Sequence, residues 1–240
     1  QKYLDVTKSQ MFFAKGIIFV EGISEAILLP EIAKILDRPL EKYAVELVNV
    51  DSVAFSPFVN LFSSQNVQTC FSKVAIVTDD DRCTKKSETN YINKDFDYDD
   101  VNSDISGKLL SGTPSERCNE LETSCRAVGI NVFKATKTLE YALCCDENNI
   151  EYFIEAIKSE YSQLGPALEQ KVNSLHDMNE KAACVWLFIR AREKCKGAIA
   201  QYISQIIKKQ CEMRKRGENI EKEFVIPDYL KEAVYCVTER

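Results

Sequence analysis

A short apolar run that leads directly into a helical pattern is the feature that most constrains the fold. Residues 17–20 (Ile-Ile-Phe-Val) are apolar at every position and are flanked by glycines, which is typical of a strand buried on both faces. Ser24 is suited to cap a helix, and apolar residues then recur at helical spacing until Arg38 and Pro39. A buried strand followed by a helix is the repeating unit of a parallel sheet.

The same alternation continues along the first part of the chain, although Pro30 falls inside the first helical pattern, where it would kink or restart the helix. The remaining predicted elements are strands at 45–50, 73–78 and 130–135 and helices at 55–62 and from 113 to about 129. We therefore predict an α/β fold with a mostly parallel sheet flanked by helices and a helical C-terminal appendage.

The two parts of the chain differ in pattern. Residues 79–104 hold nine acids and four bases without clear periodicity, so we expect a long acidic loop, placed at 82–112. The last hundred residues are almost entirely helical in pattern, with helices expected at 149–161, 177–194, 197–214 and 227–237. We predict a core domain at 1–145 and a helical region at 146–240.

Composition excludes several classes of protein. The longest apolar stretch, 182–189, is far shorter than the roughly 20 residues that cross a bilayer, and the first residues given do not show the basic-then-apolar-then-small pattern of a signal peptide. The chain has ten cysteines but no Cys-x-x-Cys pair, and His176 is its single histidine, so it lacks the ligand pattern of a structural zinc site. Cysteines spread in this way favour a reducing cytoplasm. The net charge, 31 − 37 = −6, argues against a protein that coats nucleic acid nonspecifically, although a chain with an acidic total can still have a local basic face.

Acids follow two of the predicted strands. Glu21 follows the first strand directly, Glu25 falls in the first turn of the next helix, and Asp79-Asp80-Asp81 follows the strand at 73–78. Carboxyl ends of parallel strands meet at one edge of a sheet, and Asp79 and Asp81 project to the same side of an extended segment while Asp80 projects away. Taken singly, each motif is more often a solvated loop or a helix cap than part of a metal site. Together they predict a site for Mg²⁺, Mn²⁺ or Ca²⁺, which prefer oxygen ligands.

Two motifs resemble the topoisomerase-primase (TOPRIM) domain of the overcoming-lysogenization-defect (OLD) nuclease family. They are the segment at 12–30 (FFAKGIIFVEGISEAILLP) and Val77-Thr78-Asp79-Asp80-Asp81. Three later segments resemble further motifs of the same family: an acidic motif at 138–141 (TLEY), a late lysine motif at 196–200 (KGAIA) and a C-terminal helix at 226–230 (IPDYL). The resemblance therefore covers most of the chain.

The resemblance implies a metal-dependent endonuclease that nicks DNA or cuts both strands. Glu21, Asp79 and Asp81 would ligate one Mg²⁺ or Mn²⁺ ion directly, and Glu25 and Glu140 would complete a second site, with Ca²⁺ as a non-productive substitute. The catalytic residues would be Glu21, Asp79 and Lys196, whose ammonium would face the charge that develops on the phosphate. Thr78 is expected only to end its strand.

The resemblance also implies partners. The family joins this domain to an N-terminal ABC-type ATPase, but no Gly-x-x-x-x-Gly-Lys-Ser/Thr loop occurs here, so we expect a C-terminal fragment of a larger protein. DNA, that ATPase, further copies of the full-length chain and a helicase-type defence protein are the expected partners, with antiphage defence in a prokaryotic cytoplasm as the setting and no membrane.

Residues 187–216 hold most of the clustered positive charge. They contain nine bases against Glu193 and Glu212, a balance of 9 − 2 = +7, so the segment either follows a DNA backbone or is simply the outer face of two helices. The nine bases are Arg190, Arg192, Lys194, Lys196, Lys208, Lys209, Arg214, Lys215 and Arg216. Cys144, Cys145 and Cys195 have no histidine nearby in sequence to activate a thiol, and we expect them to pack.

Two alternatives to a nuclease stay open. The long helical region also suits a noncatalytic dimerisation module within a larger ATPase. The strand leading to Asp79 also suits a haloacid-dehalogenase-like phosphohydrolase, although Cys83 stands where that family has Thr or Val.

Overall fold

The computed structural model describes residues 10–63, 73–87 and 89–239. Contacts between residues divide the chain into two compact units. The first unit contains the chain up to Asp79, Glu116–Ala135 and the segment from Asp228 onward, and the second contains Asp80–Ser115 and Thr136–Pro227. The units are therefore not the two consecutive ranges that we predicted on either side of residue 145, because the chain passes between them four times.

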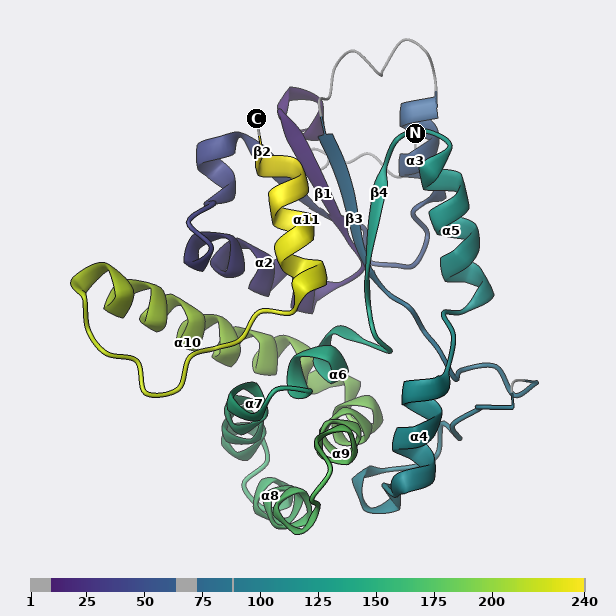
Figure 1. Cartoon of the computed structure of the whole chain (residues 1–240), viewed down its shortest axis with the longest axis vertical. Helices are drawn as coiled ribbons and strands as arrows, with labels where there is room; N and C mark the ends of the chain where they lie inside the picture. Colours follow the sequence, from purple (N-terminus) through teal and green to yellow (C-terminus); the bar gives the residue numbers. More distant parts are fainter. Residues whose placement is uncertain (1–9, 64–72, 88, 240) are drawn as a thin grey trace. The chain divides into compact units, whose positions relative to one another are not determined.

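A four-stranded parallel sheet forms the centre of the first unit (Figure 1). Its strands are β1 (Gly16–Val20), β2 (Val45–Asn49), β3 (Lys73–Asp79) and β4 (Asn131–Ala135), in the order β2-β1-β3-β4. β1 lies between two neighbours and all five of its residues are buried, as its apolar sequence predicts. The four predicted strands and the parallel α/β sheet are confirmed.

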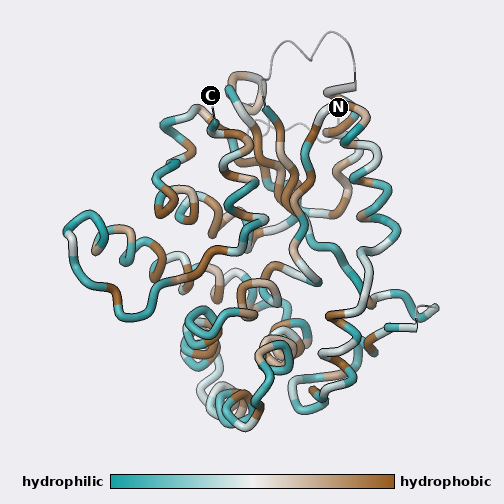
Figure 2. The backbone as a smooth tube through the Cα atoms, viewed as in Figure 1, coloured by the Kyte–Doolittle hydropathy of each residue, from teal (hydrophilic) through white to brown (hydrophobic). Residues whose placement is uncertain are grey.

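Helices cover both faces of this sheet. α3 (Ser56–Ser63) and α5 (Glu116–Arg126) pack on the face that carries Ile17 and Phe19, and a short 3-10 helix, η1 (Gln10–Phe13), adds Met11 to the same core. The rings of Phe19 and Phe58 lie 5.1 Å apart at the centre of this core. The apolar colouring of the strands in Figure 2 follows from burial on both sides.

α11 (Asp228–Thr238) covers the other face and comes very close to β1. A Cβ atom on Gly16 would lie 3.1 Å from the carbonyl oxygen of Val237, so a larger residue would force its neighbours to shift by a few tenths of an ångström. α2 (Ile23–Ile35) packs against β2 and α11 and continues through Pro30, which therefore does not restart the helix. A second 3-10 helix, η2 (Leu40–Tyr43), leads into β2.

The second unit is helical and is organised around α9 (Met178–Ala191). Residues 182–189 are all buried, and four helices and η3 pack against them. The other elements of this unit are η3 (Tyr98–Asp100), α4 (Ser103–Ser111), α6 (Leu139–Cys144), α7 (Glu147–Glu160), α8 (Leu164–Ser174), η4 (Glu193–Cys195) and α10 (Lys196–Arg216). Helices α7, α9, α10 and α11 confirm the four helices predicted in the last hundred residues. In the part of the chain that the structure describes, no helix combines the length and the apolarity needed to cross a bilayer.

Three helices of the second unit were not predicted. α4 lies inside the segment expected as an acidic loop, and its two buried apolar residues, Ile105 and Leu109, are one turn apart. α8 likewise buries only Leu168 and Val172 among its larger apolar residues, and α6 is less than two turns long. Such short patterns do not distinguish a helix from a loop, and packing against other helices of the unit decides the outcome.

The close approach of α11 to β1 can be tested at Gly16. We expect Gly16→Ala to lower the free energy of unfolding by about 1–3 kcal/mol, because the new methyl group would meet the backbone oxygen and Cβ of Val237 in α11 and a side-chain carbon of Val45 in β2. Gly107→Ala in α4 is the matched control, since its Cβ meets nothing within 4 Å and the change should stabilise the helix by about 0.5–1 kcal/mol. Urea denaturation measures both, and equal effects would contradict the explanation.

Candidate metal and nucleic-acid site

The pairing of β1 with β3 brings two predicted ligands to one edge of the sheet. Val20 is aligned with Val77, so Glu21, the residue after β1, lies beside Thr78. Asp79 is the last residue of β3. Both acids therefore belong to the first unit and lie at the carboxyl ends of neighbouring parallel strands, where ligand sites of α/β sheets form.

Two residues that sequence analysis did not select hold the Glu21 carboxylate. The hydroxyl of Thr78 donates a hydrogen bond of 2.6 Å to Glu21 Oε2. Arg117 Nη2, on α5, lies 3.8 Å from the same oxygen and donates to the carbonyl oxygen of Asp79 at 3.3 Å. Thr78 thus does more than end its strand. Arg117 is distant in sequence, and no local pattern shows that α5 begins beside this edge.

Glu25 is buried although it is acidic, with 6% of its surface exposed. It lies in the first turn of α2, where the helix dipole favours negative charge. A Cβ atom on Gly22 would lie 3.5 Å from Glu25 Oε2, so the carboxylate folds back over the start of its own helix.

Asp80, in the second unit, anchors the chain that follows β3. The carboxylate is 2% exposed and forms an ion pair with Arg82, whose Nε and Nη2 donate to Asp80 Oδ2 at 2.8 and 2.5 Å. The backbone N–H groups of Arg82 and Lys137 donate to the other oxygen at 3.1 and 2.9 Å. A buried carboxylate with four donors is a stable structural element. The middle acid of the motif therefore has a structural role.

The residue after this anchor, Asp81, has an unusual backbone conformation. Its φ of 52° lies in the left-handed region, and Cys83 and Lys137 in the same unit have φ values of 64°. Residues other than glycine enter this region at a cost of about 1–2 kcal/mol, although aspartate tolerates it better than most. The hydrogen bonds to Asp80 hold the segment in this conformation and so determine the course of the chain at Asp81.

The second unit brings together the two residues taken from the later motifs. Lys196 Nζ, at the start of α10, lies 3.7 Å from Glu140 Oε1, in the first turn of α6. The Glu140 side chain is 8% exposed and that of Lys196 is 33% exposed. The hydroxyl of Thr138 accepts a hydrogen bond from the backbone N–H of Tyr141 and so caps α6.

The predicted ligands do not form a closed metal cluster. Within the described ranges, no three His, Cys, Asp or Glu side chains lie close enough together to hold one ion. Carboxylates repel one another in the absence of a cation, and Glu21 turns toward Thr78 and Arg117. The donors are all oxygen atoms, which fits Mg²⁺ or Mn²⁺ in chemistry.

Two of the nine bases in the basic segment, Arg190 and Arg192, are engaged in contacts within the second unit. Arg190 Nη2 donates to the carbonyl oxygens of Asn93 and Phe96 at 3.0 and 2.8 Å. Arg192 forms a bidentate pair with Asp97, with both bonds at 2.8 Å. These arginines tie the acidic segment to α9, and the interpretation of all nine bases as one DNA-following surface is therefore wrong for Arg190 and Arg192.

Two of the three cysteines singled out in the sequence, Cys144 and Cys195, are not built for nucleophilic catalysis, whereas Cys145 is exposed and does not pack in the core as expected. Cys144 and Cys195 are buried, and burial raises the pKa of each thiol. A thiol with a raised pKa is mostly protonated at neutral pH and is a weak nucleophile. These two residues act as small apolar groups in the packing of the second unit.

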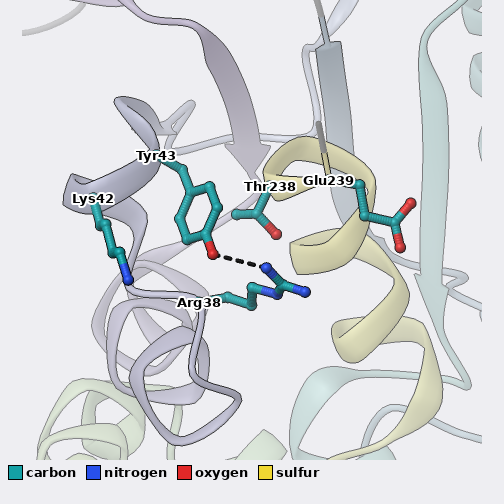
Figure 3. Close-up of a pocket in the computed structure, with 5 residues that line it drawn as sticks. All are labelled: Arg38, Lys42, Tyr43, Thr238 and Glu239. Carbon is teal, nitrogen blue, oxygen red and sulfur yellow. Dashed lines mark hydrogen bonds between the residues drawn. The ribbon is translucent and has the colours of Figure 1, made fainter.

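A pocket of about 470 Å³ lies at the opposite edge of the first unit's sheet (Figure 3). Its position follows from Lys73, the first residue of β3, which donates a hydrogen bond to the carbonyl oxygen of Glu239. Arg38 Nη1 donates to the Tyr43 hydroxyl at 2.7 Å. The negative ends of α2 and α11 and the Glu239 carboxylate offset the two cations here. The lining residues are Arg38, Lys42, Tyr43, Thr238 and Glu239, none of them a predicted site residue.

Comparison with known proteins agrees with the fold. Residues 12–81 match the family described as "Overcoming lysogenization defect protein-like, TOPRIM domain". Comparison with curated protein sequences returned no match. The C-terminal region of the Xanthomonas campestris pv. campestris OLD protein, in the crystal form phased with iodine, superposes with a TM-score of 0.58 at 20% identity, covering 95% of this chain and 96% of that one.

The C-terminal region of the Burkholderia pseudomallei OLD protein superposes with a TM-score of 0.54 at 21% identity, covering 94% of this chain and 97% of that one. At such identities the superpositions show the fold alone. Residues 12–81 therefore match the OLD-like TOPRIM domain in sequence, and the chain as a whole shares the fold seen in the C-terminal region of OLD proteins.

Proposed function

We propose that this chain is a divalent-metal-dependent endonuclease domain that cleaves DNA phosphodiester bonds. The observation that carries the proposal is the placement of Glu21 and Asp79 at the ends of neighbouring parallel strands inside the TOPRIM match. TOPRIM domains are in general metal-dependent domains that process nucleic acids, so we infer that the two carboxylates at this edge bind the metal.

The metal ligands in this proposal are those of the sequence analysis. Glu21, Asp79 and Asp81 hold one ion, and Glu25 and Glu140 complete a second site. A bound Mg²⁺ or Mn²⁺ ion would polarise the phosphate of the DNA and lower the pKa of a water molecule bound to the ion. The protein holds the Glu21 carboxylate through the Thr78 hydroxyl before any ion arrives, which reduces the rearrangement needed for binding.

Lys196 is the residue proposed to stabilise the transition state. Glu140 lies 3.7 Å from its ammonium group and restrains it, while a third of the lysine side chain stays exposed and accessible to a phosphate. A fixed cation near the reacting phosphate lowers the barrier because it needs no reorientation during the reaction.

The wider setting belongs to the same proposal and is supported by the likeness to OLD proteins. It comprises DNA as substrate, linkage to an N-terminal ABC-type ATPase, self-association of the full-length protein, a helicase-type partner, antiphage defence and a prokaryotic cytoplasm.

A noncatalytic module within a larger protein is the second candidate. It is favoured by the finding that no three potential ligands of the described residues lie within reach of one ion. Titration with Mn²⁺ separates the two candidates, because a noncatalytic module has no reason to bind the ion at these acids.

Asp79 provides the first test of the nuclease. With supercoiled plasmid and Mn²⁺ or Mg²⁺, we expect Asp79→Asn to reduce cleavage by at least about 100-fold, since even outer-shell partners of a metal are worth about 10–100-fold. Asp37→Asn is the matched control, because Asp37 is exposed at the end of α2 and asparagine tolerates its φ of 62°. Unchanged cleavage in Asp79→Asn would contradict the ligand assignment.

Arg117 provides a second test, independent of catalysis. Its guanidinium lies 3.8 Å from Glu21 and opposes the arrival of another cation. We expect Arg117→Gln to tighten Mn²⁺ binding by about three- to tenfold, near 1 kcal/mol, as measured by electron paramagnetic resonance. Arg126→Gln, on the same helix but paired with Glu122, should leave Mn²⁺ binding unchanged. Weaker binding in Arg117→Gln would show instead that Arg117 orders the ligands.

Lys196 provides the third test. We expect Lys196→Gln to lower single-turnover cleavage by about 100-fold or more without weakening Mn²⁺ binding, because the lost charge acts on the transition state. Lys194→Gln removes a neighbouring exposed lysine and serves as the matched control. Equal rates for the two variants would remove Lys196 from the catalytic group.

A further inference from the structure

Helix α10 presents one face to the interior of the second unit and leaves much of the opposite face exposed from Gln201 to Lys215, where Lys209 also borders a pocket that residues 219–222 help to line. The buried side is formed by residues at helical spacing: Ile199, Ala200, Ile203, Ile207, Gln210 and Cys211. The helix has 21 residues, which at about 1.5 Å per residue gives a length of about 31 Å. Such a long open face is large enough to contact an extended partner.

The charges on α10 separate into two groups. Arg214 pairs with Glu223 at 3.3 Å and Arg216 pairs with Glu218 at 2.8 Å, so these bases are engaged by the segment that follows the helix. Lys208, Lys209 and Lys215 are exposed, and no carboxylate of the described residues lies within ion-pair distance of them. These three lysines are therefore available to an external anion without breaking an ion pair.

The rest of the open face suits the approach of a nucleic-acid backbone. Near the start of α10, a Cβ atom on Gly197 would meet nothing within 4 Å, and Gln201 and Gln205 add exposed, uncharged hydrogen-bonding groups. Glu212 is an acid between Lys208 and Lys215 on this face. With three lysines against one carboxylate, the face keeps a net positive charge in a chain whose total charge is −6.

The spacing of the lysines assigns them a place along the substrate. Lys208 and Lys215 lie about 18 Å and 28 Å from Lys196 along the helix axis. One strand of B-form DNA advances about 3.4 Å per nucleotide, so these distances correspond to roughly five to eight nucleotides. Lysines this far away cannot serve the phosphate that Lys196 faces, but they can bind phosphates that flank it.

We propose that Lys208, Lys209 and Lys215 on the open face of α10 bind the sugar–phosphate backbone of duplex DNA beside the cleaved bond. This inference rests on the proposed function, since it concerns the same substrate. Its ligand is the phosphate backbone and not a base sequence, because lysine ammonium groups act as point charges.

The experiment measures binding of a fluorescent 30-base-pair duplex by anisotropy, without divalent metal, over a range of salt concentrations. The test variant is Lys208→Gln/Lys209→Gln/Lys215→Gln. The control is Arg214→Gln/Arg216→Gln/Lys222→Gln, which removes the same charge from bases already paired, Lys222 with Glu151. Each lost phosphate contact should reduce the slope of log K against log salt by about 0.9.

We expect the test variant to lose about 2–3 units of slope and to bind about tenfold more weakly or worse at moderate salt, while the control changes the slope by less than one unit. Equal changes in both variants, no change in either, or no duplex binding by the parent chain would each overturn the inference. Cleavage of plasmid by the test variant at low salt is scored separately. If the test variant still cleaves plasmid and its slope of log K against log salt is unchanged, the proposed lysine surface is wrong but the nuclease proposal stands. If the parent chain binds the duplex but does not cleave plasmid, the nuclease proposal is wrong but the binding surface stands.

Discussion

The candidate site depends on the parallel pairing of β1 with β3. This pairing aligns Val20 with Val77 and so places a glutamate, a threonine hydroxyl and an aspartate at adjacent positions on one edge of the sheet. A shift of one residue in register would turn Glu21 away from Thr78 and break the hydrogen bond between them. Close packing on both faces holds the register, with the Phe19 side chain against α3 on one side and the bare backbone of Gly16 against α11 on the other. The packing that fixes the strand register therefore also fixes the positions of the acids.

Asp80 adds a second constraint beyond the strand end. Its buried carboxylate joins Arg82 and the backbone of Lys137, two segments of the second unit that are far apart in sequence. Removal of the carboxylate would leave buried donors without a partner, which costs more than the hydrogen bonds themselves contribute. The three consecutive aspartates thus have different surroundings: Asp79 ends a strand, Asp80 is an internal anchor, and Asp81 follows in a left-handed conformation.

Much of the fold could be predicted from the sequence because its signals are local. The run at 17–20 is apolar throughout and becomes the central strand, and the long apolar stretch in α9 becomes the centre of the helical unit. Short helices such as α8 could not be predicted, since two buried residues one turn apart carry too little pattern. The acids at the strand ends were recognisable for the same local reason. Arg117 was not, because its proximity to Glu21 comes from tertiary packing of α5.

The basic segment illustrates the same difference. Nine positive charges in 187–216 look alike in a sequence, yet the structure commits Arg190 and Arg192 to the acidic segment and leaves Lys208 and Lys215 open. Net charge over a window therefore overstates the surface that a phosphate backbone can reach. The partners of each base decide its availability, and these partners lie up to 97 residues away.

The interleaved course of the chain has a consequence for any attempt to divide it. The helix that covers one face of the sheet, α11, is the last element of the chain, while the sheet itself is made from residues before 136. A fragment that stops after the last strand would expose a row of apolar side chains to water and would tend to aggregate. The two units are therefore inseparable by a single cut, and the C-terminal residues complete a structure that the N-terminal residues begin.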